Sequence, residues 1–271
     1  MKLGLGSYAF RWNIGIGGFR PSVPMTPMDV LDKAQALGLG LVQYADNIPL
    51  HLRDKAEIAE LASEARQRGI TLELGMQSFD AEGIRQYLDL CEILDARLLR
   101  IAFDAADAGL PIEQLATQFG PILDAAEARD VRLAIENHFN YPSPRLVRLL
   151  DAVDRPSLGI CLDVANSICA REWPEHTIAM LAPYAINLHL KDYVIRPDEN
   201  GVGFHIEGVQ LGRGLTDIDW VLGQLDHMPQ DAGVILEHWL PMQDSVNATL
   251  QAEHDWLDET VGTARKYLPA A

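Results

Sequence analysis

Residues 132–163 read RLAIENHFNYPSPRLVRLLDAVDRPSLGICLD, and this stretch contains the pattern that decides the fold. Its two apolar runs, Arg132–Glu136 and Leu158–Leu162, have the length and composition of buried strands. Between them, Ser143–Val153 carries apolar residues at intervals of three and four, which is the spacing of an amphipathic helix. A strand, a helix and a second strand in this order predict two parallel strands joined by a right-handed crossover.

The same alternation of short apolar runs and helical stretches continues on both sides of this segment. The runs that we expect to be strands are Leu3–Ser7, Leu41–Ala45, Thr71–Met76, Leu98–Phe103, Arg132–Glu136, Leu158–Leu162, Ile186–Leu190 and Val234–Glu237. The helices that we expect are Pro27–Leu37, Lys55–Arg68, Asp80–Leu94, Pro111–Arg129, Ser143–Val153, Pro174–Leu181, Ile218–Leu225 and Ser245–Tyr267.

Eight strand–helix units in 271 residues favour a closed (β/α)8 TIM barrel, an α/β fold, over an open sheet. A doubly wound sheet is the alternative, but the first strand–helix turn, Gly6-Ser-Tyr-Ala-Phe-Arg11, lacks the glycine spacing that binds a pyrophosphate. No linker interrupts the pattern, so residues 1–271 are expected to form one domain. The connections at residues 8–25 and 191–216 are long, as is typical of functional lids or disordered insertions.

The charge of the chain argues against nucleic acid and anionic membranes as partners. It has 39 acidic against 22 basic residues, a formal net charge of −17, and a field of that sign repels phosphate groups. The first ten residues, MKLGLGSYAF, lack the apolar core of a secretion signal, and no window is long and apolar enough to cross a bilayer. The three cysteines have no metal-binding spacing, as expected of reduced thiols. We therefore expect a cytoplasmic protein.

Each of the last four predicted strands is apolar until its carboxyl end, where an acid or an imidazole follows. These residues are Glu136, Asp163, His189 and Glu237. In a closed barrel the four strand ends lie side by side on one rim, where the active sites of such barrels are built. Three carboxylates at one mouth repel one another unless a cation lies between them. Oxygen ligands with one imidazole nitrogen suit a single divalent metal, with Mn²⁺ or Mg²⁺ favoured and Co²⁺ or Zn²⁺ as alternatives.

The motifs around these residues resemble a known family. Their order along the chain is Ile-Glu-Asn-His, Leu-Asp-Val-Ala-Asn, Leu-His-Leu-Lys-Asp, Leu-Gly-Arg-Gly-Leu-Thr-Asp-Ile-Asp-Trp and a final Leu-Glu. This order resembles the xylose isomerase-like barrels. More narrowly, it resembles the sugar phosphate isomerase/epimerase group, which includes ketose 3-epimerases, hydroxypyruvate isomerases and inosose dehydratases. The resemblance covers nearly the whole chain and specifies a superfamily, not a substrate.

The resemblance implies roles for five residues. It implies that Glu136, Asp163, His189 and Glu237 bind the metal. It also implies that the two glutamates of this set are the catalytic acid/base groups, on opposite faces of the substrate. Arg213, in the glycine-flanked loop after the seventh strand, is expected to help bind the substrate. Barrels of this group often pair, so a homo-oligomer is expected.

Four further residues are candidates for substrate binding because of their positions. His138 lies two residues past the glutamate of the fifth strand, where it could contact substrate or bond to a neighbouring loop. Lys191 lies two residues past the histidine of the seventh strand and should face the same way, towards a hydroxyl, phosphate or carboxylate. His205 lies in the second long connection and is a candidate lid residue. Asn166 stands where abasic-site endonucleases of this superfamily, and commonly the ketose 3-epimerases, carry histidine, which argues against both activities.

The chemistry that we expect is metal-dependent isomerisation or epimerisation of a small ketose-like sugar. A metal that holds the carbonyl and a neighbouring hydroxyl of a ketose acidifies the adjacent C–H bond and stabilises the enediolate that forms. One carboxylate can remove that proton and a second can return it. A dehydratase, that is, a lyase acting on an inosose or keto-sugar, shares this first step and is the first alternative. A sugar-binding barrel without catalysis is the second. In every case the partner is a small sugar or sugar derivative.

Overall fold

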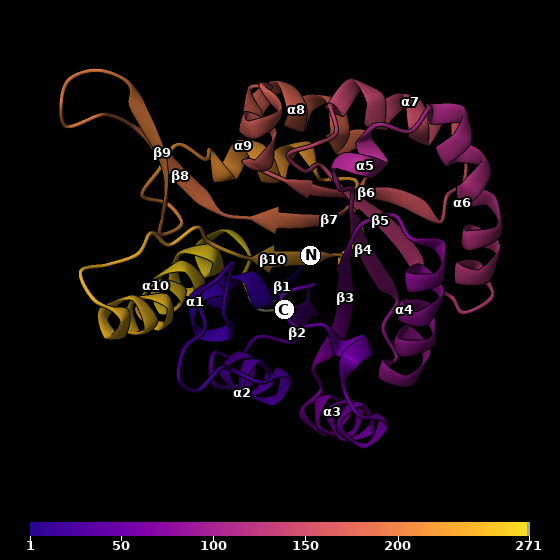
Figure 1. Ribbon diagram of the computed structural model, residues 1–271, viewed down its shortest axis with the longest axis horizontal. Helices are drawn as coiled ribbons and strands as arrows, with labels where there is room; N and C mark the ends of the chain where they lie inside the picture. The colour runs from indigo at the N-terminus through magenta and orange to yellow at the C-terminus, as the bar shows by residue number, and fades with distance from the viewer. Residues whose placement is uncertain (270–271) are drawn as a thin grey trace.

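Eight parallel strands close into a barrel in the computed structural model, which describes residues 1–269 (Figure 1). These strands are β1 (Lys2–Gly6), β2 (Leu41–Tyr44), β3 (Thr71–Gln77), β4 (Leu98–Ala102), β5 (Arg132–Glu136), β6 (Leu158–Asp163), β7 (Ala185–Leu190) and β10 (Gly233–Leu236). Around the barrel they follow the order β1-β10-β7-β6-β5-β4-β3-β2, and each neighbouring pair is parallel. The predicted (β/α)8 TIM barrel is confirmed.

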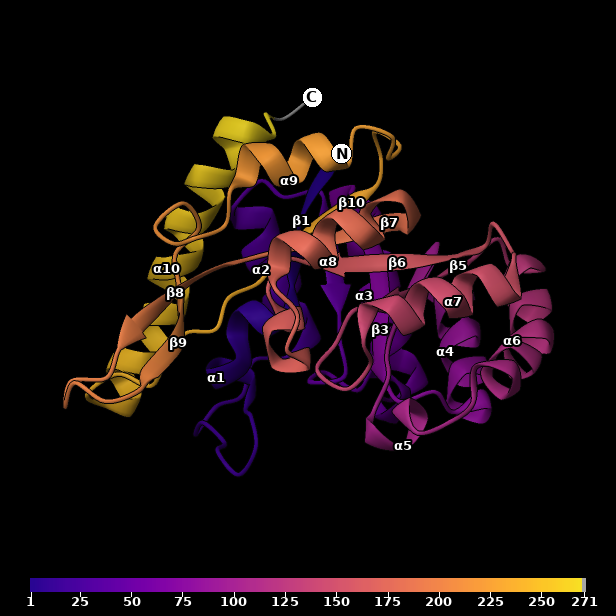
Figure 2. The same ribbon diagram turned by 90° about the horizontal axis from the view of Figure 1, so that it is seen from above.

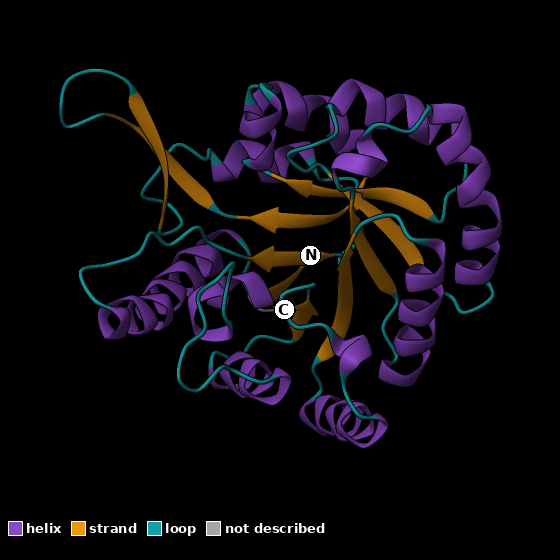
Figure 3. Ribbon diagram, in the orientation of Figure 1, coloured by secondary structure: helices purple, strands orange, loops and turns teal. Residues whose placement is uncertain are grey.

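Helices surround the outside of the barrel (Figure 3). The longer ones are α2 (Pro27–Ala36), α3 (Lys55–Arg68), α4 (Ala81–Leu94), α6 (Ile112–Glu127), α7 (Ser143–Val153), α8 (Pro174–Leu181), α9 (Ile218–Gln224) and α10 (Val246–Tyr267). Short helical turns are η1 (Ser7–Phe10), α1 (Arg11–Ile14), η2 (Leu50–Leu52), α5 (Ala105–Ala108), η3 (Asn166–Ala170) and η4 (Ala182–Tyr184). Within residues 1–269, no helix combines the length and the apolar character needed to span a bilayer.

The ends of these helices follow local signals in the sequence. Thr26 and Asp29 form a capping box at the start of α2, in which each side chain accepts the other's backbone N–H. Gly69 ends α3 in the left-handed conformation, with φ of 66°, which a residue with a Cβ adopts only with strain. Because both signals act over a few residues, they set the helix bounds without help from the rest of the fold.

The inside of the barrel holds a small apolar cluster, Leu98, Ala134 and Cys161, and a buried polar network, unlike the apolar layer between strands and helices. Side chains alternate between the two faces of each strand. On β2, the Tyr44 hydroxyl donates to the carbonyl oxygen of Pro27 in α2, so Tyr44 faces the helices. Its neighbour Gln43 therefore faces inward, where its amide donates to Glu73 of β3. A buried polar group is costly unless it has a partner, so a polar barrel interior indicates a functional site.

The first long connection, residues 8–25, is partly helical and is attached to α10. Glu253 of α10 accepts the backbone N–H groups of Trp12 and Asn13, each at 2.8 Å. Its Oε2 also accepts the Asn13 side-chain amide at 2.8 Å. Glu253 is fully buried and holds α1 beside the carboxyl ends of the strands (Figure 2).

The second long connection, residues 191–216, contains a β-hairpin that the sequence analysis did not predict. Its strands β8 (Asp192–Pro197) and β9 (Phe204–Val209) pair antiparallel and project away from the barrel (Figure 1). A partial signal was present: Phe204 and Ile206 alternate with polar residues along β9, but Tyr193–Ile195 of β8 is a continuous apolar run. The connection is thus a regular element and not an irregular lid.

Candidate metal centre and active site

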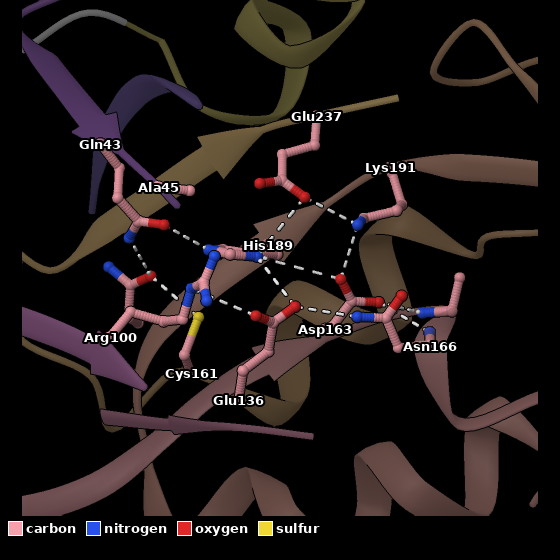
Figure 4. Close-up of polar contacts among 12 residues, drawn as sticks. Gln43, Ala45, Arg100, Glu136, Cys161, Asp163, Asn166, His189, Lys191 and Glu237 are labelled. Atoms are coloured by element: carbon pink, nitrogen blue, oxygen red, sulfur yellow. Dashed lines mark hydrogen bonds and ion pairs between the residues drawn. The ribbon is translucent and has the colours of Figure 1, made fainter. Parts of the chain in front are cut away.

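The four predicted metal ligands converge at the carboxyl ends of four neighbouring strands (Figure 4). Glu136 and Asp163 are the last residues of β5 and β6, His189 lies near the end of β7, and Glu237 directly follows β10. His189 Nδ1 lies 3.4 Å from Glu136 Oε1, 3.5 Å from Glu237 Oε2 and 3.9 Å from Asp163 Oδ2. All four residues are buried. Gly6 of β1 makes room for the Glu237 side chain, because a Cβ on Gly6 would come within 2.9 Å of Glu237 Cγ.

The donor atoms of this cluster fit a divalent cation. Within residues 1–269, His189 Nδ1 is among the buried polar atoms that have no hydrogen-bond partner, while Asp163 Oδ2 has the Lys191 ammonium at 2.7 Å. Both atoms face the same point, and one atom each of Glu136, Asp163 and His189 lie within 4.8 Å of one another. Separations of 3 to 4 Å are those of ligand atoms that share a cation at about 2.0–2.2 Å. A cation would give the His189 nitrogen a partner.

The ring of His189 is oriented by Gln43. His189 Nε2 lies 2.7 Å from Gln43 Oε1, so Nε2 carries the hydrogen and Nδ1 presents its lone pair to the carboxylates. Gln43 is 1% exposed and comes from β2, across the barrel from β7. A hydrogen bond of this kind is the usual way in which a protein selects the ligating nitrogen of a histidine.

Glu136 is held by two neighbours. Arg100 of β4 is buried, and its Nε lies 3.2 Å from Glu136 Oε2. The Asn166 amide donates to Glu136 Oε1 at 2.8 Å. Gly75 of β3 makes room for the guanidinium, since a Cβ there would lie 3.1 Å from Arg100 Nε. Asn166, predicted from the sequence to bind substrate, lies against Glu136 and in the pocket wall.

Lys191 bridges the two carboxylates on either side of β7. Its Nζ lies 2.7 Å from Asp163 Oδ2 and 2.7 Å from Glu237 Oε2, and the side chain is 3% exposed. The ammonium also lies 5.3 Å from the centre of the Trp239 ring. The site therefore contains a fixed positive charge of its own beside the predicted metal ligands.

These opposite charges control the protonation of the cluster. Burial alone would raise the pKa of Glu136, but in the metal-free protein the charges of Arg100 and of protonated His189 outweigh burial and hold that pKa well below its usual range. A cation at Nδ1 would take the place of the proton on His189. Burial likewise raises the pKa of Glu237, while His189 and Lys191 lower it further than burial raises it. Both glutamates are therefore ionised at neutral pH, which suits metal binding and makes them weak bases.

A cavity of about 290 Å³ opens above this cluster. Its walls are formed by Tyr8, Arg11, Ile16, Asp46, Gln77, Arg100, Glu136, His138, Phe139, Asn166, Lys191, Glu237, His238 and Trp239. His138 stacks on Phe139, with 4.1 Å between ring centroids. Burial lowers the pKa of His138, so its ring is neutral at pH 7. Of the predicted substrate-binding residues, His138, Asn166 and Lys191 are thus brought to the pocket.

His205 and Arg213 are not brought to the pocket. His205 lies on β9 of the projecting hairpin, and its Nε2 is 2.5 Å from Asp198 Oδ2. Arg213 pairs with Glu259 of α10, with 2.7 Å between Nη2 and Oε2. Both side chains are more than half exposed. The hairpin carries the connection outward before it returns to α9, which separates these residues from the strand ends.

Several residues of the pocket and the barrel interior were not predicted from the sequence, among them Asp46, Gln43, Tyr8, Arg11 and Glu73. Asp46 follows β2, and its carboxylate accepts the Tyr8 hydroxyl at 2.8 Å and lies 3.4 Å from Arg100 Nη2. An acid directly after a predicted strand was the same kind of signal that identified the predicted metal ligands. Gln43 could have been noticed as a polar residue inside an apolar strand. Tyr8 carried no signal, since an aromatic residue in a loop is most often a packing residue.

Comparisons with known proteins agree with the barrel fold. The family described as xylose isomerase-like TIM barrel matches residues 31–260. A protein of Pectobacterium atrosepticum named 3-oxo-isoapionate decarboxylase is 31% identical over 256 residues, which are 94% of this chain and 92% of that protein.

Two solved structures show the same fold at low identity. One is D-psicose 3-epimerase with D-tagatose from Clostridium cellulolyticum H10, with a TM-score of 0.68, 18% identity and coverage of 98% of both chains. The other is a xylose isomerase-like TIM barrel protein from Mycobacterium smegmatis in complex with magnesium, with a TM-score of 0.69, 14% identity and coverage of 97% of both chains. The match to the family over most of the sequence shows that the chain belongs to the xylose isomerase-like TIM barrels.

Proposed function

We propose that this protein is a metal-dependent decarboxylase of a small 3-oxo sugar acid. The observation that carries the proposal is the balance of charge around the pocket. The charged groups are the carboxylates of Asp46, Glu136, Asp163 and Glu237 and the cationic side chains of Arg11, Arg100 and Lys191. Four negative and three positive charges leave one net negative charge, and a divalent cation would convert it to one net positive charge. A substrate with one carboxylate neutralises that charge, whereas a neutral sugar does not.

The relatives support both parts of this proposal. The Pectobacterium atrosepticum protein, which matches over nearly its whole length, is named for decarboxylation of a 3-oxo acid. The Mycobacterium smegmatis barrel was solved with magnesium. The cavity of about 290 Å³ is at the small end of the range for ligand pockets, which favours a single small sugar acid.

Decarboxylation of a 3-oxo acid breaks the bond between C1 and C2 and releases CO₂. The bonding electron pair moves into the carbonyl at C3, and a proton then adds to C2. A divalent cation held by Glu136, Asp163, His189 and Glu237 would stabilise the negative charge that develops on the C3 oxygen. Lys191 and Arg11 attract the acid and orient it. Glu237 is ionised and accepts a hydrogen bond from Lys191 at 2.7 Å, so it holds the ammonium in place, and the proton that adds to C2 comes from solvent.

Isomerisation or epimerisation of a ketose is the second candidate, because Glu136 and Glu237 both flank the ligating nitrogen of His189. That chemistry begins when a carboxylate removes a proton from carbon. Here both glutamates have pKa values lowered by cationic neighbours. The first step of decarboxylation needs no base, so the electrostatics of this site favour it. The expected isomerase or epimerase activity stays a prediction.

One experiment separates these reactions. Protein loaded with Mn²⁺ is incubated in D₂O with a panel of 3-oxo sugar acids, ketoses and inososes, and the products are followed by mass spectrometry and CO₂ release. We expect CO₂ and one deuterium on the former C2. Deuterium exchange with an unchanged formula would indicate an isomerase or epimerase, and loss of water would indicate a dehydratase. Thermal stabilisation by a sugar without any exchange would indicate a binding protein.

A further inference from the structure

We infer that Glu73, a buried carboxylate that does not line the pocket, selects the metal-binding nitrogen of His189 by orienting the amide of Gln43. The three residues form a chain across the inside of the barrel, from β3 through β2 to β7. The inference rests on the proposed metal site and adds a positioning residue to it.

The first step is that the metal-binding nitrogen of His189 must be Nδ1. Its Nδ1 faces Glu136, Asp163 and Glu237, so only Nδ1 can bind a cation held by these carboxylates. Nδ1 is a ligand only when the hydrogen is on Nε2. Gln43 Oε1, at 2.7 Å from Nε2, accepts that hydrogen (Figure 4). Gln43 must therefore present its oxygen, not its NH₂ group, to the ring.

The second step is what decides the orientation of Gln43. The oxygen and nitrogen of an amide exchange places by a half-turn, with almost no change of shape. Gln43 Nε2 donates to Glu73 Oε2 at 3.0 Å and to Asn187 Oδ1 at 3.3 Å. Asn187 Nδ2 in turn donates to Glu73 Oε2 at 2.9 Å, so Asn187 is oriented by the same carboxylate. Glu73 is the member of this chain that accepts hydrogen bonds and has no N–H to donate.

The third step is that neither bulk water nor a reversed Gln43 amide readily replaces the hydrogen bond that Glu73 accepts. Gln43 is 1% exposed, Asn187 is fully buried and Glu73 is 7% exposed, so bulk water does not reach the chain freely. A reversed Gln43 amide would set its NH₂ against the Nε2–H of His189 and its oxygen against Glu73. The fold also reserves space for the carboxylate, because a Cβ on Gly233 would lie 2.7 Å from Glu73 Oε1.

Binding of Mn²⁺ to purified variants, measured by isothermal titration calorimetry, tests the inference. Glu73→Met removes the acceptor, and we expect it to weaken Mn²⁺ affinity by about 10-fold or more, as is typical for loss of a partner behind a metal ligand. Gln43→Met removes the partner of Nε2 directly and should weaken affinity to a similar extent, so the inference can be judged if one of the two variants does not fold.

The double variant Glu73→Met/Gln43→Glu distinguishes orientation from simple packing. A carboxylate at position 43 presents an acceptor in either orientation, so we expect it to restore Mn²⁺ affinity to within about threefold of wild type. In Zn²⁺-loaded, ¹⁵N-histidine-labelled protein, the hydrogen-bonded Nε2–H signal of His189 should be present in wild type and in the double variant, and lost in Glu73→Met.

Glu253→Met is the matched control, since it removes an equally buried carboxylate that contacts Trp12 and Asn13 instead. Its Mn²⁺ affinity should stay within about threefold of wild type. Wild-type protein that takes up no Mn²⁺ would overturn the metal site and this inference together. Wild type that binds Mn²⁺, with a Glu73→Met variant that binds it equally well, would overturn this inference alone.

Discussion

Lys191 and Glu237 form a buried ion pair at the mouth of the barrel, with 2.7 Å between Nζ and Oε2. The two residues directly follow β7 and β10, which are hydrogen-bonded neighbours. The pair places a positive charge on the wall of the pocket and next to the predicted metal ligands. The same ammonium contacts Asp163, so one side chain is linked to two carboxylates of the cluster and to the space for substrate.

Lys191→Met should impair the use of an acidic substrate. Removing a charge partner of a bound carboxylate typically costs 2–5 kcal/mol, so kcat/KM should fall by about 100-fold or more. The measurement is steady-state CO₂ release with Mn²⁺ present, with the exposed Lys266→Met as control. A variant whose kcat/KM is unchanged would show that Lys191 does not bind the substrate.

Asp163→Ala should lose the metal. The aspartate is fully buried, and its Oδ2 lies 3.9 Å from His189 Nδ1 with the Lys191 ammonium at 2.7 Å on its other side. Elemental analysis after dialysis should find about one equivalent of metal in wild type and a small fraction of that in the variant. Asp258→Ala, at an exposed position on α10, should retain its metal. Equal metal content in Asp163→Ala and wild type contradicts the assignment.

Glu136→Gln should retain the fold and slow decarboxylation. The amide fills the same space beside Arg100 and Asn166, but it does not carry the charge of a carboxylate ligand. At saturating Mn²⁺, the rate of CO₂ release should fall by about 100-fold. An undiminished rate would show that Glu136 is not essential to the reaction.

His205→Ala and Arg213→Ala should have little effect on catalysis. Each side chain pairs with a surface carboxylate away from the pocket, Asp198 in one case and Glu259 in the other. Exposed pairs of this kind contribute about 0–1 kcal/mol, so kcat/KM should stay within about threefold of wild type. A loss of 100-fold in either variant would mean that the hairpin folds over the pocket during the reaction.

Glu253 should make stability depend on pH. Burial raises the pKa of Glu253 to about 7, although hydrogen bonds from Trp12 and Asn13 favour its charged form. Because the folded-state pKa lies above the unfolded value, the folded protein binds an extra proton between them. The free energy of unfolding should therefore fall as the pH rises from about 4.5 to about 7, by roughly 3 kcal/mol at most.

Urea denaturation at several pH values measures this dependence. Glu253→Gln replaces the titrating carboxyl group with an amide that does not titrate. The difference in unfolding free energy between wild type and variant should therefore change between pH 4.5 and pH 7. A difference that is constant from pH 4.5 to pH 7 would show that Glu253 does not titrate there.

Local sequence determined the strands and helices of this protein and the rim on which its acids lie. Arg132–Glu136, Lys55–Arg68 and Ser143–Val153 have the predicted bounds, because apolar spacing and end signals act over a few residues. The meeting of Glu136 and Glu237 at one rim could be predicted for a related reason. In a parallel barrel every strand presents its carboxyl end to the same face, so chain position alone places these residues together.

Only the tertiary structure decided which polar side chains from distant strands meet and which leave the site. Gln43 contacts His189, and Arg100 contacts Glu136, because barrel closure brings inward-facing residues of different strands together. Arg213 lies outside the pocket although it belongs to the connection after β7, because the hairpin directs that connection outward. Sequence separation carries no information about such contacts. They depend on the alternation of side chains between the two faces of each strand, the order of strands around the barrel and the path of each connection in space.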